Sequence, residues 1–131
     1  MQEPSIFTRI INGEIPSHKV YEDDRILAIL DVRPVFEGHT LVITKKQVDH
    51  IWDLDDDEYD YLWKTTKKIG QHIREVIKSP RVGIVVEGYG VPHVHVHIIP
   101  IYEGDDLKKS PDFSKDIDHG ALARTAARLL M

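Results

Sequence analysis

Three histidines occupy every second position of one short apolar stretch, VPHVHVHIIP, which spans residues 91–100. Alternate side chains of a β-strand point to the same face, so we expect His93, His95 and His97 to stand in a row while the intervening apolar residues face a core. Imidazole titrates near neutral pH, and it is a nucleophile when neutral and a proton donor when charged. The row therefore indicates nucleophilic or acid–base chemistry on one face of a sheet.

The spacing of this row bears on the ligand that it could bind. Each step of two residues spans about 6.6 Å, so the outer two histidines would lie roughly 13 Å apart along the strand. A metal ion needs ligand nitrogens about 2.0–2.1 Å away, so His95 and His97 could share one metal with a third ligand from elsewhere, whereas all three could not easily do so. A longer anionic ligand, such as a phosphate chain, suits the row better.

Composition narrows the class of protein. The 131 residues carry a formal charge of −5, which argues against a nucleic-acid-binding protein with a basic surface. The sequence has no cysteine, which excludes disulfides and thiolate metal ligands. No signal peptide and no apolar run of membrane-spanning length are visible. We expect a cytoplasmic protein that binds neither nucleic acid nor membrane.

The hydrophobic pattern predicts the elements that must position these histidines. A short helix is expected over residues 5–13, with Ser5 as its cap. Residues 53–78 predict a long helix, because acidic residues crowd its start and basic ones its end around an apolar stripe. Stretches rich in β-branched residues predict strands at residues 19–23, 25–32, 39–45, 81–88 and 91–101. The chain is polar after Tyr102, and a last helix is expected over residues 118–131.

Three segments together resemble one known family. HVHVHII matches the motif of the histidine triad (HIT) family, in which three histidines alternate with apolar residues. The run SIFTRIINGEIPSHKVYEDD resembles that family's first helix and strand, and GHTLVITKK resembles its glycine–histidine signature. The resemblance covers roughly residues 4–102, and the small nucleotide-binding and phosphoramidase-type members are the most similar branch.

The resemblance implies an α+β fold with a five-stranded antiparallel sheet, one long helix and a short N-terminal helix. Members usually pair as homodimers that join two sheets into one. We therefore predict a HIT domain over residues 1–102 and a partly helical C-terminal extension over residues 103–131. The packing partner of this extension is left open by the sequence.

The resemblance also implies a mechanism of nucleotidyl transfer. His95 would attack the α-phosphorus of a nucleoside phosphoramidate, a dinucleoside polyphosphate or a similar conjugate, and water would then release the monophosphate from a nucleotidyl-histidine intermediate. His97 and His39 would contact phosphate oxygens or the leaving group. His93 would orient His95 through a main-chain carbonyl, which fits the general need to fix the tautomer of a nucleophile.

A purine nucleotide pocket carries over from the family in the same way. Asp31 matches the acidic residue that accepts hydrogen bonds from the ribose hydroxyls, and a carboxylate has two oxygens for two vicinal hydroxyls. Apolar walls for the base are expected at Phe7, Ile10, Val32 and Leu41. Gly90 and Val91, just before the histidine row, complete the predicted nucleotide site, where glycine N–H groups could bind phosphate.

The sequence departs from the family pattern at two places. Cysteines that hold a structural zinc in many bacterial relatives are replaced by Ser5 and Thr8, and a nearby histidine by Gln47, so we expect no metal and no other cofactor. Gly90 stands where relatives have a hydroxyl that helps the leaving group, and Glu87 stands near the place of a phosphate-binding asparagine. Two alternatives to a hydrolase therefore stay open: a nucleotide-binding module with little turnover, and a metal-binding protein that uses His95 and His97.

Overall fold

The chain forms an α+β fold around one five-stranded antiparallel sheet, as expected, and the computed structural model describes residues 2–131. The order of the strands in the sheet is β1-β2-β3-β5-β4, and every neighbouring pair is antiparallel. The elements in chain order are α1 (Ile6–Ile11), β1 (Lys19–Glu22), β2 (Ile26–Leu30), β3 (Thr40–Thr44), η1 (Ile51–Asp53), α2 (Asp56–Ile77), β4 (Arg81–Val85), β5 (His95–Ile101), η2 (Asp106–Lys108) and α3 (His119–Leu129).

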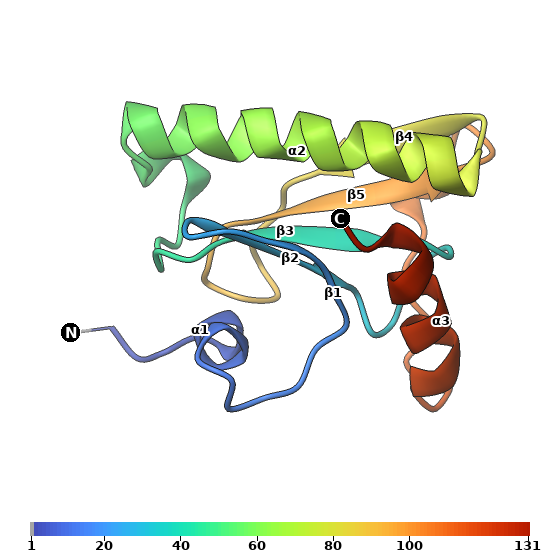
Figure 1. Cartoon of the computed structure of the whole chain (residues 1–131), viewed down its shortest axis with the longest axis horizontal. Helices are drawn as coiled ribbons and strands as arrows, with labels where there is room; N and C mark the ends of the chain where they lie inside the picture. The colour runs from blue at the N-terminus through green and yellow to red at the C-terminus, as the bar shows by residue number, and fades with distance from the viewer. Residues whose placement is uncertain (1) are drawn as a thin grey trace.

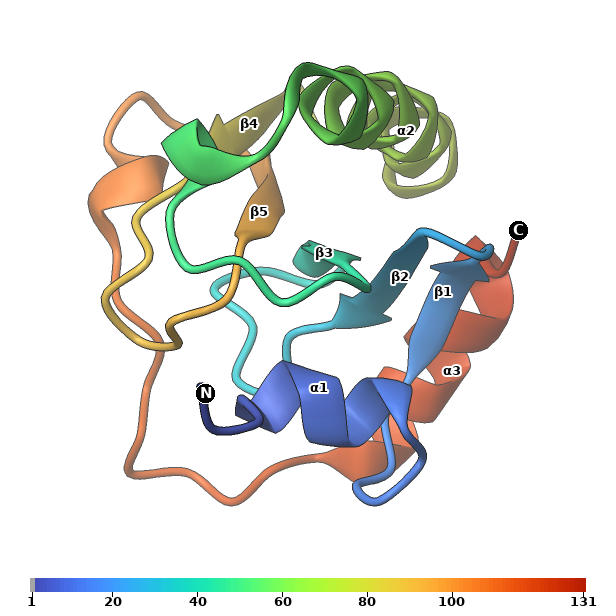
Figure 2. The same cartoon turned by 90° about the vertical axis from the view of Figure 1, so that its left-hand side faces the viewer.

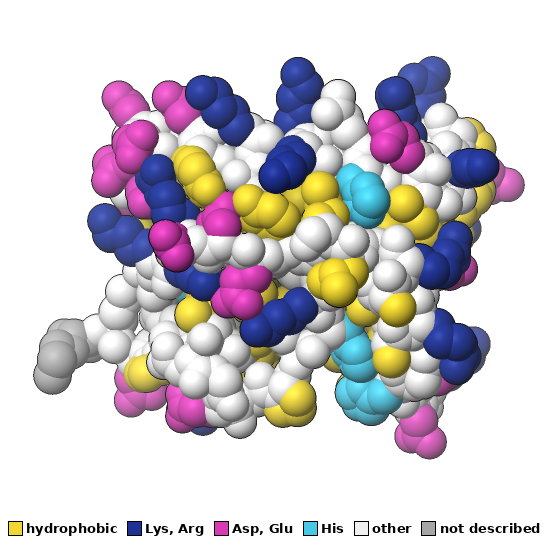
Figure 3. All heavy atoms as spheres, viewed as in Figure 1, with side chains coloured by type: hydrophobic (Ala, Val, Ile, Leu, Met, Phe, Trp, Pro, Cys, Tyr) yellow, Lys and Arg dark blue, Asp and Glu magenta, His cyan; other side chains and the backbone are white. Residues whose placement is uncertain are grey.

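Helix α2 covers one face of the sheet along its full length (Figure 1). The Asp55 side chain caps its first turn by accepting a hydrogen bond from the Glu58 N–H, and three acidic residues follow in that turn, where they interact favourably with the helix dipole. Figure 3 shows acidic side chains gathered at this end of the molecule. Lys78 ends the helix in a left-handed conformation with φ 61°. The apolar stripe of α2 packs on the sheet through buried Leu62, Ile69 and Ile73.

Helix α1 lies on the opposite face of the sheet (Figure 2). Ser5 caps it as predicted, because its hydroxyl accepts a hydrogen bond from the Thr8 N–H. Phe7 is buried against a smaller apolar cluster whose strand residues are Leu27, Ile29, Leu41 and Ile43. The face under α1 is therefore the one that carries the histidines of β5.

The last strand starts later than the sequence predicts. β5 begins at His95 rather than at residue 91, since residues 89–93 form bends and Pro92 has no N–H to offer to a sheet. The His93 N–H bonds to the Val91 carbonyl at 2.8 Å instead. In register, His95 lies opposite Ile43 and His97 opposite Leu41. The expected row of three strand histidines thus consists of two on β5 and one in the turn before it.

The C-terminal extension packs on the main core. Leu122, Ala126 and Leu129 of α3 are buried in the same apolar cluster as the inner face of α2. The Met131 N–H also donates a hydrogen bond of 2.9 Å to the Val20 carbonyl of β1. Figure 1 shows α3 at the end of the sheet away from α1. This packing supplies the partner that the sequence leaves open. None of the helices within residues 2–131 combines the length and apolar character that crossing a membrane requires.

Candidate active site

His95 presents one free ring nitrogen. Its Nδ1 lies 2.7 Å from the main-chain carbonyl oxygen of His93. A carbonyl oxygen only accepts, so the neutral ring must carry its proton on Nδ1. The ring packs edge-on against Phe7 with 4.8 Å between centroids, and His95 is 6% exposed. Nε2 has no hydrogen-bond partner within residues 2–131 and keeps its lone pair, which is the form that a nucleophile requires.

His93 is fixed from both sides and fully buried. Its Nε2 lies 2.6 Å from the Thr44 carbonyl oxygen and therefore carries the proton, whereas Nδ1 accepts from the Ser5 hydroxyl at 2.6 Å. Burial lowers the pKa of His93, although the Thr44 carbonyl opposes this change and His95 adds to it. The buried His93 presents its carbonyl oxygen to His95 Nδ1, and this is the contact through which His93 is predicted to orient that ring.

His39 and His97 form a hydrogen-bonded pair beside His95. His39 Nε2 lies 2.9 Å from His97 Nδ1, and the rings of His95 and His97 are 5.0 Å apart. Gly38 precedes His39 with φ 94°, and a Cβ there would meet the Ile77 side chain at 3.0 Å, so the glycine–histidine signature has a steric cause. Burial lowers the pKa of His39 even though Asp31 raises it.

Asp31 lies next to this pair at the end of β2. Its Oδ2 is 3.6 Å from His39 Nε2, and its Oδ1 accepts a 2.9 Å hydrogen bond from the Arg33 N–H. The Asp31 N–H bonds to the His39 carbonyl at 3.0 Å, which ties the two strand ends together. The structure thus brings together, in one place, the four histidines and the carboxylate that the sequence singles out.

The predicted nucleotide walls divide into two groups. Phe7 and Leu41 are buried in the cluster under α1, and Ile10 and Val91 pack against it. Val32 is separate from that cluster and lines a small cavity of about 180 Å³ beside α3. Gly90 is exposed, and nothing lies within 4 Å of the position that its Cβ would take.

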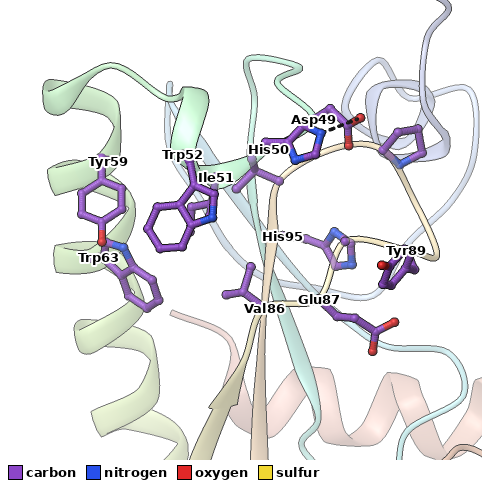
Figure 4. A pocket seen from close by; sticks show the side chains of 13 residues that line it. Asp49, His50, Ile51, Trp52, Tyr59, Trp63, Val86, Glu87, Tyr89 and His95 are labelled. Carbon is purple, nitrogen blue, oxygen red and sulfur yellow. Dashed lines mark ion pairs between the residues drawn. The ribbon is translucent and has the colours of Figure 1, made fainter.

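A larger cavity, of about 700 Å³, opens beside His95 (Figure 4). Four aromatic side chains line it, and they come from η1, α2 and the segment before β5: Trp52, Tyr59, Trp63 and Tyr89. The carboxylate of Glu87 lies at its rim and points away from the His95 ring (Figure 4). The sequence gives no pattern that places these aromatic residues near the histidines, because they come from three separate segments.

Hydrogen bonds join Ser5, Thr8 and Gln47, the three positions at which the resemblance raises the question of a zinc site. Gln47 Oε1 accepts from the Thr8 hydroxyl at 2.6 Å and from the Ser5 N–H at 2.9 Å, and the Ser5 hydroxyl bonds to His93. Neutral hydroxyl and amide groups are poor zinc ligands, so this donor set does not fit the metal.

A second set of groups comes closer to a metal site. Single ligand atoms of Asp31, His39 and His97 lie within 4.8 Å of one another. The Val35 N–H, however, donates to His39 Nδ1 at 3.2 Å. A metal on His39 Nε2 would require the ring proton on Nδ1, facing that N–H, so the arrangement disfavours a metal ion bound through His39 Nε2.

A family model for the HIT domain matches residues 12–104. The chain belongs to the HIT family. It is 45% identical over 105 residues to an uncharacterized HIT-like protein of Methanocaldococcus jannaschii, which covers 76% of this chain and 81% of that protein. A hypothetical histidine triad nucleotide-binding protein from Sulfolobus tokodaii superposes with a TM-score of 0.81 at 35% identity, covering 94% of this chain and 87% of that one. A HIT family hydrolase from Legionella pneumophila superposes with a TM-score of 0.64 at 30% identity over 75% and 93% of the two chains. Family membership suggests nucleotide-related hydrolase or transferase activity.

Acid should destabilise this site. Burial, together with His39 and His95, lowers the pKa of His97 from 6.5 to about 4. Between about pH 6.5 and pH 4, His97 is protonated in the unfolded chain but neutral in the folded protein. The free energy of unfolding therefore falls as the pH falls through this range. The free energy of unfolding should drop by about 2 kcal/mol more between pH 7 and pH 5 in the wild type than in His97→Asn. Urea unfolding at both pH values measures this difference, and parallel pH dependences would contradict it.

Proposed function

We propose that this HIT protein is a nucleotide hydrolase of the phosphoramidase-like branch. Its substrates would be nucleoside phosphoramidates, dinucleoside polyphosphates or related conjugates, with the purine nucleotide held between α1 and Asp31. The observation that supports this most is the Nδ1 contact of His95 with the His93 carbonyl, which leaves an unprotonated Nε2 next to His97. Because family membership suggests nucleotide-related chemistry, the phosphorus of a nucleotide is the atom that this nitrogen would attack.

The proposed reaction has two steps at phosphorus. His95 Nε2 forms a bond to the α-phosphorus, the bond from phosphorus to the leaving amine or phosphate breaks, and the leaving group takes its proton from water. The ring then carries a positive charge, which its Nδ1–H shares with the His93 carbonyl. Water next attacks phosphorus and gives a proton to the solvent, which replaces the one that the leaving group took. The P–N bond to His95 breaks, and the monophosphate is released with His95 neutral again.

A trapping experiment tests the proposal directly. The protein is mixed with an adenosine phosphoramidate, quenched without acid within milliseconds to seconds, and digested for mass spectrometry. We expect release of the monophosphate and a nucleotidyl group on the peptide that contains His95. Turnover without any adduct would point to direct attack by water, and no turnover at all would overturn the hydrolase proposal.

Asp31→Asn should weaken nucleoside binding more than chemistry. The amide keeps one oxygen for the Arg33 N–H but loses the second acceptor for the ribose hydroxyls. Loss of a charged hydrogen bond should raise the dissociation constant of adenosine monophosphate roughly tenfold to a hundredfold, whereas ribose-free phosphate binding should change little. Calorimetric titration with both ligands measures this difference, and an unchanged affinity for the nucleotide would remove Asp31 from the pocket.

A binding module with little turnover is the second candidate. Gly90 is exposed and offers no side-chain hydroxyl, and the Glu87 carboxylate points away from His95, so neither of these two positions supplies a donor to a leaving group (Figure 4). A substrate series decides between the candidates. A hydrolase should cleave conjugates with good leaving groups rapidly, whereas a binding module should hold all of them without turnover. The cytoplasmic location expected from the sequence stays a prediction.

We also propose that two copies of the chain pair through β4. This strand ends the sheet, and its Ile84 is 48% exposed. An end strand offers a row of N–H and C=O groups to a second strand. Sedimentation at micromolar concentration should show a dimer, which Ile84→Lys should dissociate, whereas Leu130→Lys at the far side of the sheet should not. A wild-type monomer would contradict the pairing.

A further inference from the structure

A series of hydrogen bonds connects the main chain at Val35 to His97 by way of the His39 ring. The Val35 N–H donates to His39 Nδ1 at 3.2 Å, and His39 Nε2 lies 2.9 Å from His97 Nδ1. His97 Nε2 has no hydrogen-bond partner among residues 2–131 and is the ring nitrogen left for a ligand. Three groups thus stand in series, and only the first of them, a main-chain amide, has a fixed donor role.

The fixed donor determines where the protons of both rings lie. Because an N–H points at His39 Nδ1, this nitrogen must accept, so a neutral His39 carries its proton on Nε2. That proton points at His97 Nδ1, which must accept in turn, so His97 carries its proton on Nε2. The reverse arrangement, or a doubly protonated His39, would place two hydrogens face to face between His39 and Val35.

We propose that the Val35 main-chain N–H fixes the tautomers of His39 and His97 in series, so that His97 presents a neutral Nε2–H donor to the α-phosphate. His39 is then a positioning residue that acts through His97. The inference rests on the proposed function for the identity of the ligand. A donor aimed at a phosphoryl oxygen stabilises the charge that gathers there during transfer, whereas the opposite tautomer would aim a lone pair at that oxygen.

The neighbouring rings of His95 and His97 have opposite tautomers. The His93 carbonyl places the proton of His95 on Nδ1 and leaves Nε2 bare. The hydrogen bonds from Val35 to His39 and from His39 to His97 give His97 the opposite tautomer, with the proton on Nε2. Two rings whose centroids are 5.0 Å apart therefore offer a lone pair and a donor to the same phosphate. Both assignments originate in main-chain groups.

Nitrogen NMR of the free, full-length protein with ¹⁵N-labelled histidine tests the proton positions. At pH 7.5 we expect His97 and His39 to show a protonated Nε2 and a bare Nδ1, and His95 to show a bare Nε2 and a protonated Nδ1. A His97 with protonated Nδ1 would overturn the inference. This experiment needs no substrate, so its failure is distinguishable from absence of turnover, which would overturn the proposed function instead.

A matched pair of variants tests the cause. Val35→Pro removes the N–H, whereas Val35→Ala shortens the side chain and keeps the N–H. Only the proline variant should mix the tautomers of His39 and His97, and it should lower kcat about tenfold with little change in KM, because one neutral hydrogen bond in the transition state is weakened. If the proline variant folds and retains the wild-type ring protonation, the inference is wrong. If it does not fold, the same NMR comparison on His39→Leu, which must lose the fixed tautomer of His97, decides the question.

Discussion

His95→Ala should lower kcat for a nucleoside phosphoramidate by about 10⁴-fold or more, because it removes the atom that would bond to phosphorus. The ring is buried and held by Phe7 and the His93 carbonyl, so no other imidazole can take its place without moving the chain. His97 Nδ1 is engaged by His39, and His93 is bonded at both ring nitrogens. Monophosphate release followed by chromatography measures the loss.

The matched control for this variant is His50→Ala. His50 lines the same cavity as His95, but it is exposed, and its ring nitrogen lies 3.8 Å from the neighbouring Asp49 carboxylate. Its removal should change kcat by less than about twofold, because surface substitutions rarely alter a site that they do not touch. Comparable losses in both variants would indicate a general effect of the cavity rather than nucleophilic chemistry at His95.

Leu129→Ala should lower the free energy of unfolding by about 2–5 kcal/mol, which is the range for removing a large aliphatic side chain from a packed core. Leu129 is fully buried in the cluster that α2 and the sheet share, although it lies near the end of the chain. Denaturant unfolding followed by circular dichroism measures the change. A loss of this size would show that the extension and the sheet unfold together.

Leu130→Ala is the control at the adjacent position. Its side chain is 63% exposed, so its truncation should cost less than about 0.5 kcal/mol. Equal effects of the two substitutions, or an early separate transition for residues 103–131, would contradict the packing of α3 on the main core.

The sequence predicts the elements well where one pattern decides them. Ser5 and the apolar stripe of α2 have local causes, namely a hydroxyl cap and a helical period, and both lie where the pattern puts them. The predicted start of β5 is wrong because alternation continues through Val91 and His93, whereas Pro92 and the bends at residues 89–93 prevent sheet pairing. The burial of α3 could not be predicted, since an amphipathic helix does not reveal its partner.

The sequence predicts which side chains form the site, but it does not predict which of their ring nitrogens carry protons. The family motif points to His39, His93, His95 and His97, and the structure brings them together. Main-chain groups fix the protons on these rings: the carbonyls of His93 and Thr44 and the N–H of Val35. Every residue has the carbonyl, and every residue except proline has the N–H. Such contacts leave no trace in residue type, so only the folded chain shows them. The aromatic cavity is hidden for a related reason, because its walls come from segments distant in sequence.

Residues 119–131 partly cover one border of the sheet. The Met131 N–H donates to the Val20 carbonyl, and α3 lies beside β1, so this border is less accessible to a second strand than β4 is. Pairing through β4 alone would give a closed dimer with two-fold symmetry, whereas strand addition at both borders would give an open fibre. If the chain pairs through β4 as proposed, α3 and Met131 hinder strand addition at the β1 border. Removal of residues 119–131 should therefore favour assemblies larger than two copies.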